Sequence, residues 1–408
     1  MNKISGLKRA DGSVYADETE DKQEIQSFYQ ALYTSQGVVD TGELLAHVPV
    51  KVTPEMNETL TKPFEAKEVH DALFQMAPSK SPGMDGFTAR FFQLHWHLLK
   101  DDVTNVVLGF LNGGELPMGL NDTSITLIPK VRYPQSISQY RPIALCPVLY
   151  KLAAQAITNH MRGCINEIIS EEQSVFVPGR LITDNVLVAF ESVHTLRRRK
   201  KGKNHACAVK LDMMKAYDRV EWHYLEVILM PLVFSPAWIS LIMKCVASVR
   251  FSVRVNGELQ PYFTPSRELR QGDPASPYLF LLCAEGFSSL LKYHGHIDRG
   301  IRTSIRSPWV SHLLFVDDSM IFLNANSQSA ERLNNILWFY GKASGQCVKR
   351  DKSVIFFSPK TPYSSRQAMK GTLGVYVEVI NERYLRIPTI VGQNTSGTFD
   401  HIGEQLKE

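Results

Sequence analysis

Two adjacent aspartates, Asp317 and Asp318, lie between two apolar runs, residues 312–316 and 319–323. Apolar runs of strand length on both sides of a polar pair predict a β-hairpin whose turn carries the two carboxylates. Neighbouring carboxylates repel each other, and a folded chain keeps such a pair where a cation takes up the charge. An exposed acidic turn is the alternative interpretation of this motif taken alone.

A third carboxylate, Asp212, ends the apolar stretch 206–211, which is another strand candidate. Two strands that each bring carboxylates to one point are typical of a two-metal site for phosphoryl chemistry. The sequence therefore predicts that Asp212, Asp317 and Asp318 converge, with the carboxylates of Asp212 and Asp317 roughly 4–6 Å apart.

The bulk composition bounds the class of protein. The 408 residues are 44% hydrophobic and 21% charged, which is typical of a globular chain with two or three subdomains. A net charge of +4 permits a nucleic-acid partner without requiring one. The six cysteines form no C-x-x-C pair, and no apolar run reaches membrane-spanning length. We therefore expect an intracellular protein with buried thiols and no membrane partner; the nuclear or cytoplasmic location and the oligomeric state are not distinguished.

Hydrophobic periodicity predicts an α+β fold. Helical patterns occur at 25–33, at 65–76, from Asp101 to about residue 111, from Thr183 or Asp184 onward, from Ser276 and at 327–340. Strand patterns occur at 125–128, 251–255 and 353–357, and Asn256-Gly257 predicts a type I′ hairpin. Because these elements show no regular βαβ rhythm, we expect a mixed or antiparallel sheet backed by helices.

An aromatic residue follows the first acid closely. Tyr217 comes five residues after Asp212, and a turn over a metal site would bring its ring near a nucleotide sugar. The alternative is a core aromatic beside Trp222. For Asp218, which precedes Arg219, a structural ion pair is the favoured interpretation.

Other polar positions suggest a nucleotide pocket. Gln271 and Gly272 precede the helix at Ser276, and a glycine beside an amide lets the backbone approach a ligand closely; a simple tight turn is the alternative. Lys130 and Arg141 follow short apolar stretches and are candidates to bind a triphosphate, or they are solvated surface cations. The basic run 197–203 ends a predicted helix, where cations are favourable without any ligand; phosphate contact or nuclear targeting is the less favoured alternative.

Several short motifs are spread along most of the chain. They are KSPGMDGF at 80–87, LIPK at 127–130, YRPI at 140–143, FVPGR at 176–180, TDN at 183–185, SGQ at 344–346, KS at 352–353 and YL at 384–385. Together with the Asp212, Gln271-Gly272 and Asp317-Asp318 blocks, and in this order, they resemble the reverse transcriptases of non-LTR (LINE-type) retrotransposons, most closely those of plant genomes.

The resemblance implies a right-hand polymerase with fingers and palm. It implies that the metal-binding, catalytic residues are Asp212, Asp317 and Asp318, that Tyr217 senses the sugar, and that the remaining nucleotide-binding residues are Lys130, Arg141, Gln271, Gly272 and Lys352. Lys352 resembles a lysine that protonates pyrophosphate. The implied cofactor is a pair of Mg²⁺ ions, with Mn²⁺ as an alternative, and the implied partners are an RNA template, a DNA primer and dNTPs.

The resemblance also sets boundaries and reveals departures. We expect an N-terminal extension or linker at 1–66, fingers and palm at 67–357, and a palm-to-thumb connection with a truncated thumb at 358–408. Val316 stands in place of a usual Ala, Lys349 of a usual Asn and Arg386 of a usual Gly. A fragment of a longer polyprotein or a decaying copy is expected, with weak template binding and poor extension.

Two rival functions remain at this point. One is a catalytically inactive retroelement relic that only binds RNA. The other is an RNA-templated RNA polymerase, against which Tyr217 argues, because a bulky aromatic would exclude a 2′-hydroxyl.

Overall fold

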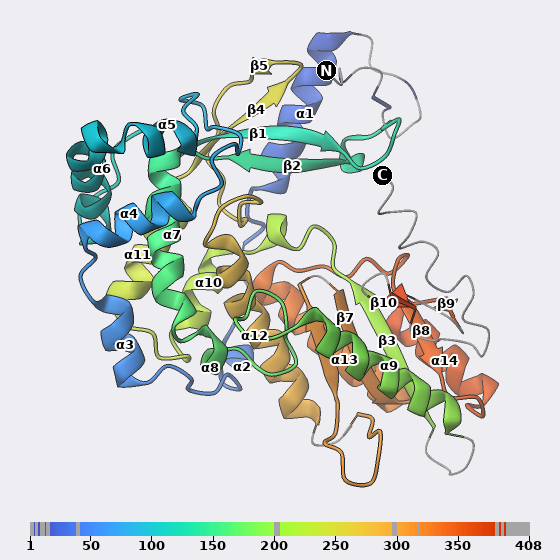
Figure 1. The fold of residues 1–408 in the computed structure, drawn as a ribbon. Coiled ribbons are helices and arrows are strands. Elements are labelled where there is room, and N and C mark those ends of the chain that lie inside the picture. Colours follow the sequence, from blue (N-terminus) through green and yellow to red (C-terminus); the bar gives the residue numbers. More distant parts are fainter. Residues whose placement is uncertain are drawn as a thin grey trace, which may run out of the picture. The chain divides into compact units, whose positions relative to one another are not determined.

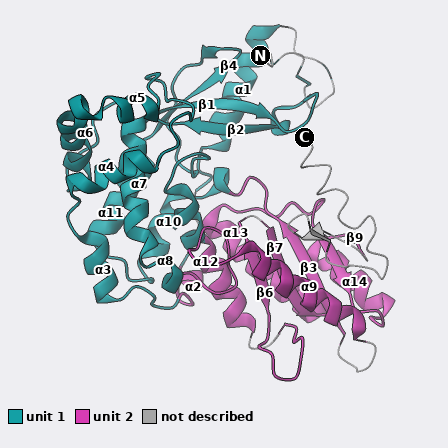
Figure 2. Cartoon of the chain, in the orientation of Figure 1, with its two compact units in different colours: residues 1–41, 49–168, 217–283 teal, residues 42–48, 169–216, 284–408 magenta. Residues whose placement is uncertain are grey.

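The chain forms two compact units, which Figure 2 shows in different colours. Unit 1 comprises residues 1–41, 49–168 and 217–283, and unit 2 comprises 42–48, 169–216 and 284–408. The computed structural model describes residues 4, 7, 8, 13, 17–37, 41–199, 205–295, 300–316, 318–379, 383, 384, 387 and 388.

Unit 1 is built on a four-stranded sheet in the order β2-β1-β4-β5. β1 (Asp122–Pro129) pairs antiparallel with β2 (Tyr140–Leu145) and parallel with β4 (Arg250–Val255), which forms a hairpin with β5 (Glu258–Leu259). The helices of this unit include α1 (Glu18–Leu32), α3 (Pro54–Thr61), α4 (Ala66–Gln75), α5 (Ala89–Leu94), α6 (Trp96–Leu111), α7 (Val148–Arg162), α8 (Ile165–Ile168), α10 (Trp222–Leu229) and α11 (Pro236–Ala247), with short 3₁₀ turns at Ile137–Gln139 and Tyr217–Arg219.

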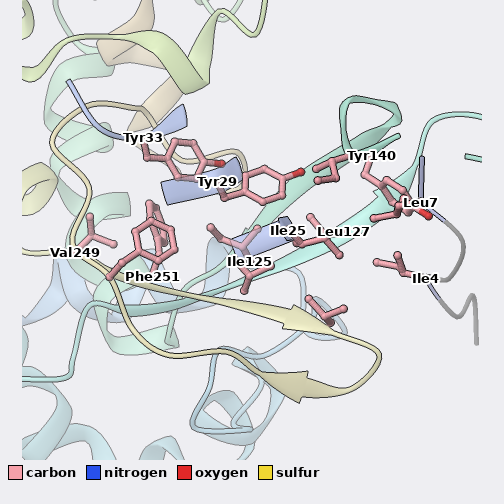
Figure 3. Close-up of a cluster of buried hydrophobic side chains, with 14 residues drawn as sticks. Ile4, Leu7, Ile25, Tyr29, Tyr33, Ile125, Leu127, Tyr140, Val249 and Phe251 are labelled. Carbon is pink, nitrogen blue, oxygen red and sulfur yellow. The ribbon is translucent and has the colours of Figure 1, made fainter. Parts of the chain in front are cut away.

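Helix α1 packs on this sheet and contributes to its core. Figure 3 shows Ile25, Tyr29 and Tyr33 beside sheet residues such as Ile125 and Phe251, and the rings of Tyr33 and Phe251 lie 5.3 Å apart. The helical pattern predicted at 25–33 is therefore confirmed. Residues 17–37 belong to unit 1 and residues 42–48 to unit 2, and the extension or linker expected at 1–66 stays a prediction.

Unit 2 is built on a five-stranded sheet in the order β6-β7-β3-β8-β9. β3 (Ala206–Asp212) lies in the middle and pairs antiparallel with β7 (Asp318–Asn324) and β8 (Val354–Phe357). β6 (His312–Phe315) and β9 (Val377–Glu378) form the edges, and β10 (Arg383–Tyr384) pairs with β11 (Ile387–Pro388). The helices are α2 (Gly42–Leu45), α9 (Ile182–Arg198), α13 (Ser327–Ser344) and α14 (Tyr363–Leu373), labelled in Figure 1, and α12 (Ser276–Gly295) continues from unit 1 into unit 2.

Helices cover both faces of the five-stranded sheet. On one face, Val193 and Leu196 of α9 share a buried cluster with Ala206, Ala208 and Phe322. On the other face, the Cys207 sulfur lies 3.7 Å from that of Met369 in α14. The predicted α+β fold, with a mixed sheet backed by helices, is confirmed.

Most predicted elements are present with small shifts at their ends. Asn256 and Gly257 have φ angles of 51° and 93°, as a type I′ turn requires, and α12 begins at Ser276 as expected. The predicted cap at Asp101 is wrong, because α6 already begins at Trp96, directly after α5, and Asp101 lies exposed within it. No helix among the described residues is both long and apolar enough to cross a membrane.

Candidate active site

The carboxylates of Asp212 and Asp318 lie on neighbouring strands. Asp212 is the last residue of β3 and Asp318 the first of β7, and the antiparallel register places them directly opposite each other. Residues directly opposite share one face of the sheet, with Cβ atoms about 4.5–5.5 Å apart. Both side chains are partly exposed. Asp317 lies outside the described residues, so its convergence with them stays a prediction.

The turn before Asp318 has a demanding backbone. Val316 follows β6 and has a φ of 53°, in the left-handed region. β-branched side chains are rare there, and such conformations persist only where the surrounding structure imposes them. The Ala-to-Val departure at this position therefore affects a strained residue, not an ordinary turn.

The end of β3 is fixed by a segment that follows α13. The backbone NH of Lys349 donates to the Asp212 carbonyl at 2.8 Å, and the NH of Met214 donates to the Cys347 carbonyl at 2.7 Å. Buried Ser353 accepts from the Asp212 NH at 3.3 Å and donates to the Lys349 carbonyl at 2.9 Å. This segment sets the position of the Asp212 backbone through main-chain atoms and one serine.

Lys352 belongs to the same turn. Its backbone NH donates to the Lys349 carbonyl at 3.1 Å, and its side chain is exposed. The structure thus places Lys352 beside the segment that contacts Asp212, in unit 2.

In unit 1, Gln271 and Gly272 contact Ala144, the penultimate residue of β2. The NH of Ala144 donates to the Gln271 carbonyl at 2.9 Å. Gly272 has a φ of 119°, and a Cβ added there would lie 2.9 Å from the Ala144 carbonyl oxygen. The glycine is therefore required by its conformation and by this close backbone contact, irrespective of any ligand.

Buried Arg270, the residue before Gln271, holds this turn in place through several contacts. Its guanidinium forms an ion pair with Asp273 at 2.8 Å, donates to the Cys245 carbonyl at 3.2 Å, and also donates to Asn121 and the Tyr150 hydroxyl. Burial acts to lower the pKa of Arg270, but Tyr150 and Asp273 outweigh it and raise that pKa. A buried ion pair, Arg270 with Asp273, therefore lies directly beside Gln271.

Tyr217 and Asp218 contact the same turn. The Tyr217 ring stacks on Phe280 of α12 at 4.8 Å, and its carbonyl accepts from the NH of Leu269 at 2.8 Å. Buried Asp218 accepts a hydrogen bond from the Gln271 side-chain amide at 3.2 Å. Phe280 is one aromatic neighbour of Tyr217, and Trp222, the predicted neighbour, donates its indole NH to the Glu268 carbonyl at 2.8 Å.

Lys130 and Arg141 lie at one end of the β1–β2 hairpin. Lys130 directly follows β1, and its side chain donates to the Ser138 carbonyl at 3.1 Å. Arg141 is the second residue of β2 and pairs with Ile128 across the ladder. Both side chains are exposed. Arg141 is three residues from Ala144, so about 10 Å of strand separates it from the Gln271 contact.

The predicted residues therefore gather in two groups, one in each unit. Lys130, Arg141, Tyr217, Gln271 and Gly272 are linked through β2 and the 269–272 turn of unit 1. Unit 2 holds the carboxylate pair and Lys352.

Three supporting residues were not predicted from the sequence: Arg270, Asp218 as a partner of Gln271, and Ser353. Ser353 stands in a quoted motif and could have been suspected. Nothing in the sequence signals that Arg270 is buried, because a single arginine beside a loop is normally exposed.

The donor set suits a hard divalent cation. Asp212 and Asp318 provide carboxylate oxygens, the ligands that Mg²⁺ and similar ions prefer. Within the described ranges there is no group of three or more His, Cys, Asp or Glu side chains that could hold a metal ion. Asp317 is the predicted further donor.

The sequence profile of the family described as "Reverse transcriptase (RNA-dependent DNA polymerase)" matches residues 128–382, more than half of the chain. The chain belongs to this reverse transcriptase family. Members of the family use divalent metal ions, in agreement with the carboxylate pair. The predicted polymerase fold is thereby confirmed.

Curated relatives point to mobile elements. The chain is 34% identical over 291 residues to "Transposon TX1 uncharacterized 149 kDa protein" of Xenopus laevis, covering 71% of this chain and 22% of the relative. It is 23% identical over 304 residues to "Retrovirus-related Pol polyprotein from type-1 retrotransposable element R2" of Popillia japonica, covering 72% and 39%. These matches confirm the resemblance of this reverse transcriptase to those of non-LTR retrotransposons.

A shorter match involves a plant. "Uncharacterized mitochondrial protein AtMg01250" of Arabidopsis thaliana is 54% identical over 67 residues, covering 16% of this chain and 55% of the relative. The plant source of this relative gives only loose support to the predicted closeness to plant elements. The chain thus spans about a fifth to about half of the length of these three relatives.

Proposed function

We propose that this chain is the RNA-directed DNA polymerase domain of a non-LTR retroelement, which transfers nucleotides from dNTPs to a primer 3′-hydroxyl on an RNA template. The observation that carries this proposal is the direct pairing of Asp212 and Asp318 at adjoining strand ends. The family match over residues 128–382 supports it.

The carboxylates are proposed to hold two Mg²⁺ ions. Asp212 and Asp318, with Asp317, would bind them at the end of β3. When bound, such ions lower the pKa of an attacking hydroxyl and neutralise charge on the leaving group. The segment 347–353 keeps Asp212 in place, and Lys352 is proposed to donate a proton to pyrophosphate.

The residues of unit 1 are proposed to bind the incoming nucleotide. Lys130 and Arg141 would contact the triphosphate, Arg141 through its planar fork of donors. Gln271 and Gly272 would line the nucleotide pocket, and Asp218 and Arg270 position them without contacting the substrate. Tyr217 would exclude a 2′-hydroxyl by steric block. Its ring stacks on Phe280, which would keep it from moving aside.

Primer extension on a defined RNA template tests this proposal. The wild-type chain should extend a DNA primer with dNTPs in Mg²⁺, and Asp212→Asn should abolish extension while leaving the fold unchanged by circular dichroism. Glu331→Gln, which neutralises an exposed acid of α13, is the matched control and should extend normally. Unchanged extension by Asp212→Asn would refute the proposed role of the carboxylates.

The two rival functions give different results in this assay. A relic that only binds RNA would bind the primer-template without extending it; it is not favoured, because both carboxylates are present and in register. An RNA polymerase would incorporate NTPs in preference to dNTPs.

A further inference from the structure

The strands of the unit 2 sheet end on two sides, and one of these two edges, made of strand ends, lies opposite the carboxylate pair. β3 begins at Ala206, and the antiparallel register puts the ends of β7 and β8, Asn324 and Phe357, at this same edge. Six residue-to-residue steps along the strand separate Ala206 from Asp212, about 20 Å at the usual rise.

The C-terminus of α9 lies at this edge. Asn185, in its first turn, donates to the carbonyl of Leu314, whereas Leu196, in its last turn, shares a buried cluster with Ala206. The helix therefore runs antiparallel to β3 and ends beside the start of that strand. Its final residues, Arg197 and Arg198, are exposed.

The loop 300–311 lies at the same edge and has a defined shape. Buried Ile301 forms a β-bridge with Val310 and belongs to the same cluster as Leu196. The NH of Phe322, near the end of β7, donates to the Ser311 carbonyl at 2.8 Å. The Arg302 Nε donates to the Ser307 carbonyl at 2.8 Å.

The loop presents cations and an aromatic ring. Arg302 and Arg306 are exposed, and Trp309 is 45% exposed. The Arg302 guanidinium lies 5.7 Å from the centre of the Trp309 ring.

We call Arg197, Arg198, Arg199, Arg302, Arg306 and Lys360 the basic end. No ion pair of these six side chains is found within the described parts of the chain. No Asp or Glu occurs among the described residues at this edge, which are 197–199, 300–311, 324–326 and 358–360. The negative end of the α9 dipole stabilises cations, which accounts for Arg197 and Arg198. It does not account for Arg302 and Arg306, which lie on a separate loop.

We infer that the basic end is a second nucleic-acid site, which binds a single strand of RNA outside the polymerase site. Arginine clusters fit phosphates, and the exposed ring of Trp309 beside Arg302 offers a platform on which one base can stack. An acidic protein surface would use the charges but not the ring. The inference goes beyond the proposed polymerase activity and does not depend on the carboxylates.

Binding is measured without dNTPs or divalent metal, by fluorescence anisotropy of a 30-nucleotide RNA. The test variant combines Arg198→Gln, Arg302→Gln and Arg306→Gln. The matched control combines Lys62→Gln, Lys67→Gln and Lys100→Gln, which removes three exposed charges from unit 1. The test variant should bind more weakly, with a slope of log affinity against log salt that is shallower by about 2, because each contact to a single strand contributes about 0.7.

Two further measurements separate the outcomes. Trp309→Ala should lower affinity for this RNA about fivefold or more, the lower limit for one stacked base. The triple arginine variant should extend a saturating short primer-template as fast as the wild type, because about 20 Å of strand separates the basic end from Asp212.

The inference fails if the arginine and lysine triple variants bind RNA equally. It also fails if polyglutamate competes with RNA as effectively as unlabelled RNA does, because the basic end would then fit an acidic protein. Loss of extension in Asp212→Asn with normal RNA binding would leave this inference intact, so the two proposals fail separately.

Discussion

A Cβ placed on Gly272 would lie 2.9 Å from the carbonyl oxygen of Ala144. The contact joins the Gln271 turn to strand β2, two elements far apart in sequence. It makes Gly272 a structural requirement of the nucleotide pocket proposed here.

Gly272→Ala should therefore destabilise the protein by about 1–3 kcal/mol, because the new methyl group meets main-chain atoms at a φ of 119°. Thermal and urea denaturation measure this loss. Gly109→Ala is the control: Gly109 lies within α6 with open space around an added Cβ, and the substitution should stabilise by about 0.5–1 kcal/mol. Equal effects of the two substitutions would show that the contact is not tight.

Asp318→Asn should abolish extension and yet slightly stabilise the metal-free protein. Like charges directly opposite each other across a strand pair repel, and removing one should gain about 0.2–1 kcal/mol. Urea denaturation in EDTA measures the gain, with Glu331→Gln as the control. A clear destabilisation would mean that Asp318 is structural.

Tyr217→Ala should raise incorporation of NTPs relative to dNTPs, because the ring would no longer block a 2′-hydroxyl. The ratio of kcat/KM for the two nucleotide types measures the change. Phe280→Leu removes the ring that supports Tyr217 and should shift the ratio in the same direction but less. Unchanged discrimination in Tyr217→Ala would reduce Tyr217 to a packing residue.

His312 predicts a pH dependence of stability. Burial lowers the pKa of this histidine to about 4, so it stays neutral in the fold, between the hydroxyls of Ser288 and Ser311. The unfolded chain binds a proton near pH 6.5. Stability is therefore unaffected above that pH and falls as the pH decreases from about 6.5 to 4, by about 3 kcal/mol in total.

His312→Gln should remove this slope in denaturation experiments between pH 7 and 4. The exposed His194→Gln is the control and should keep it. A slope that persists in His312→Gln would assign the effect to other groups.

Local patterns predicted the elements well. Apolar runs of strand length became β3, β6 and β7, and Asn256-Gly257 became the turn between β4 and β5, because these signals depend only on neighbouring residues. The carboxylates at strand ends could likewise be anticipated, because the apolar runs beside them mark where the strands end, and the hydrophobic pattern and the turn set the register.

Long-range relationships could not be predicted. The parallel pairing of β1 with β4 joins segments more than 120 residues apart, and nothing local specifies it. The same holds for the burial of Arg270, whose partners Asn121, Tyr150 and Cys245 come from three separate segments. Helix α1 was underestimated because its polar residues dominate the pattern, although Ile25 and Tyr29 are fully buried.

The contact between Lys349 and Asp212 uses only main-chain atoms. Any residue except proline presents the same NH and carbonyl, so selection for this contact constrains the side chain at position 349 only weakly. A mobile-element copy that accumulates substitutions can exchange Asn for Lys here, while the aspartate beside it keeps its place. Divergence at residue 349 is therefore a poor measure of whether such a copy has lost its activity.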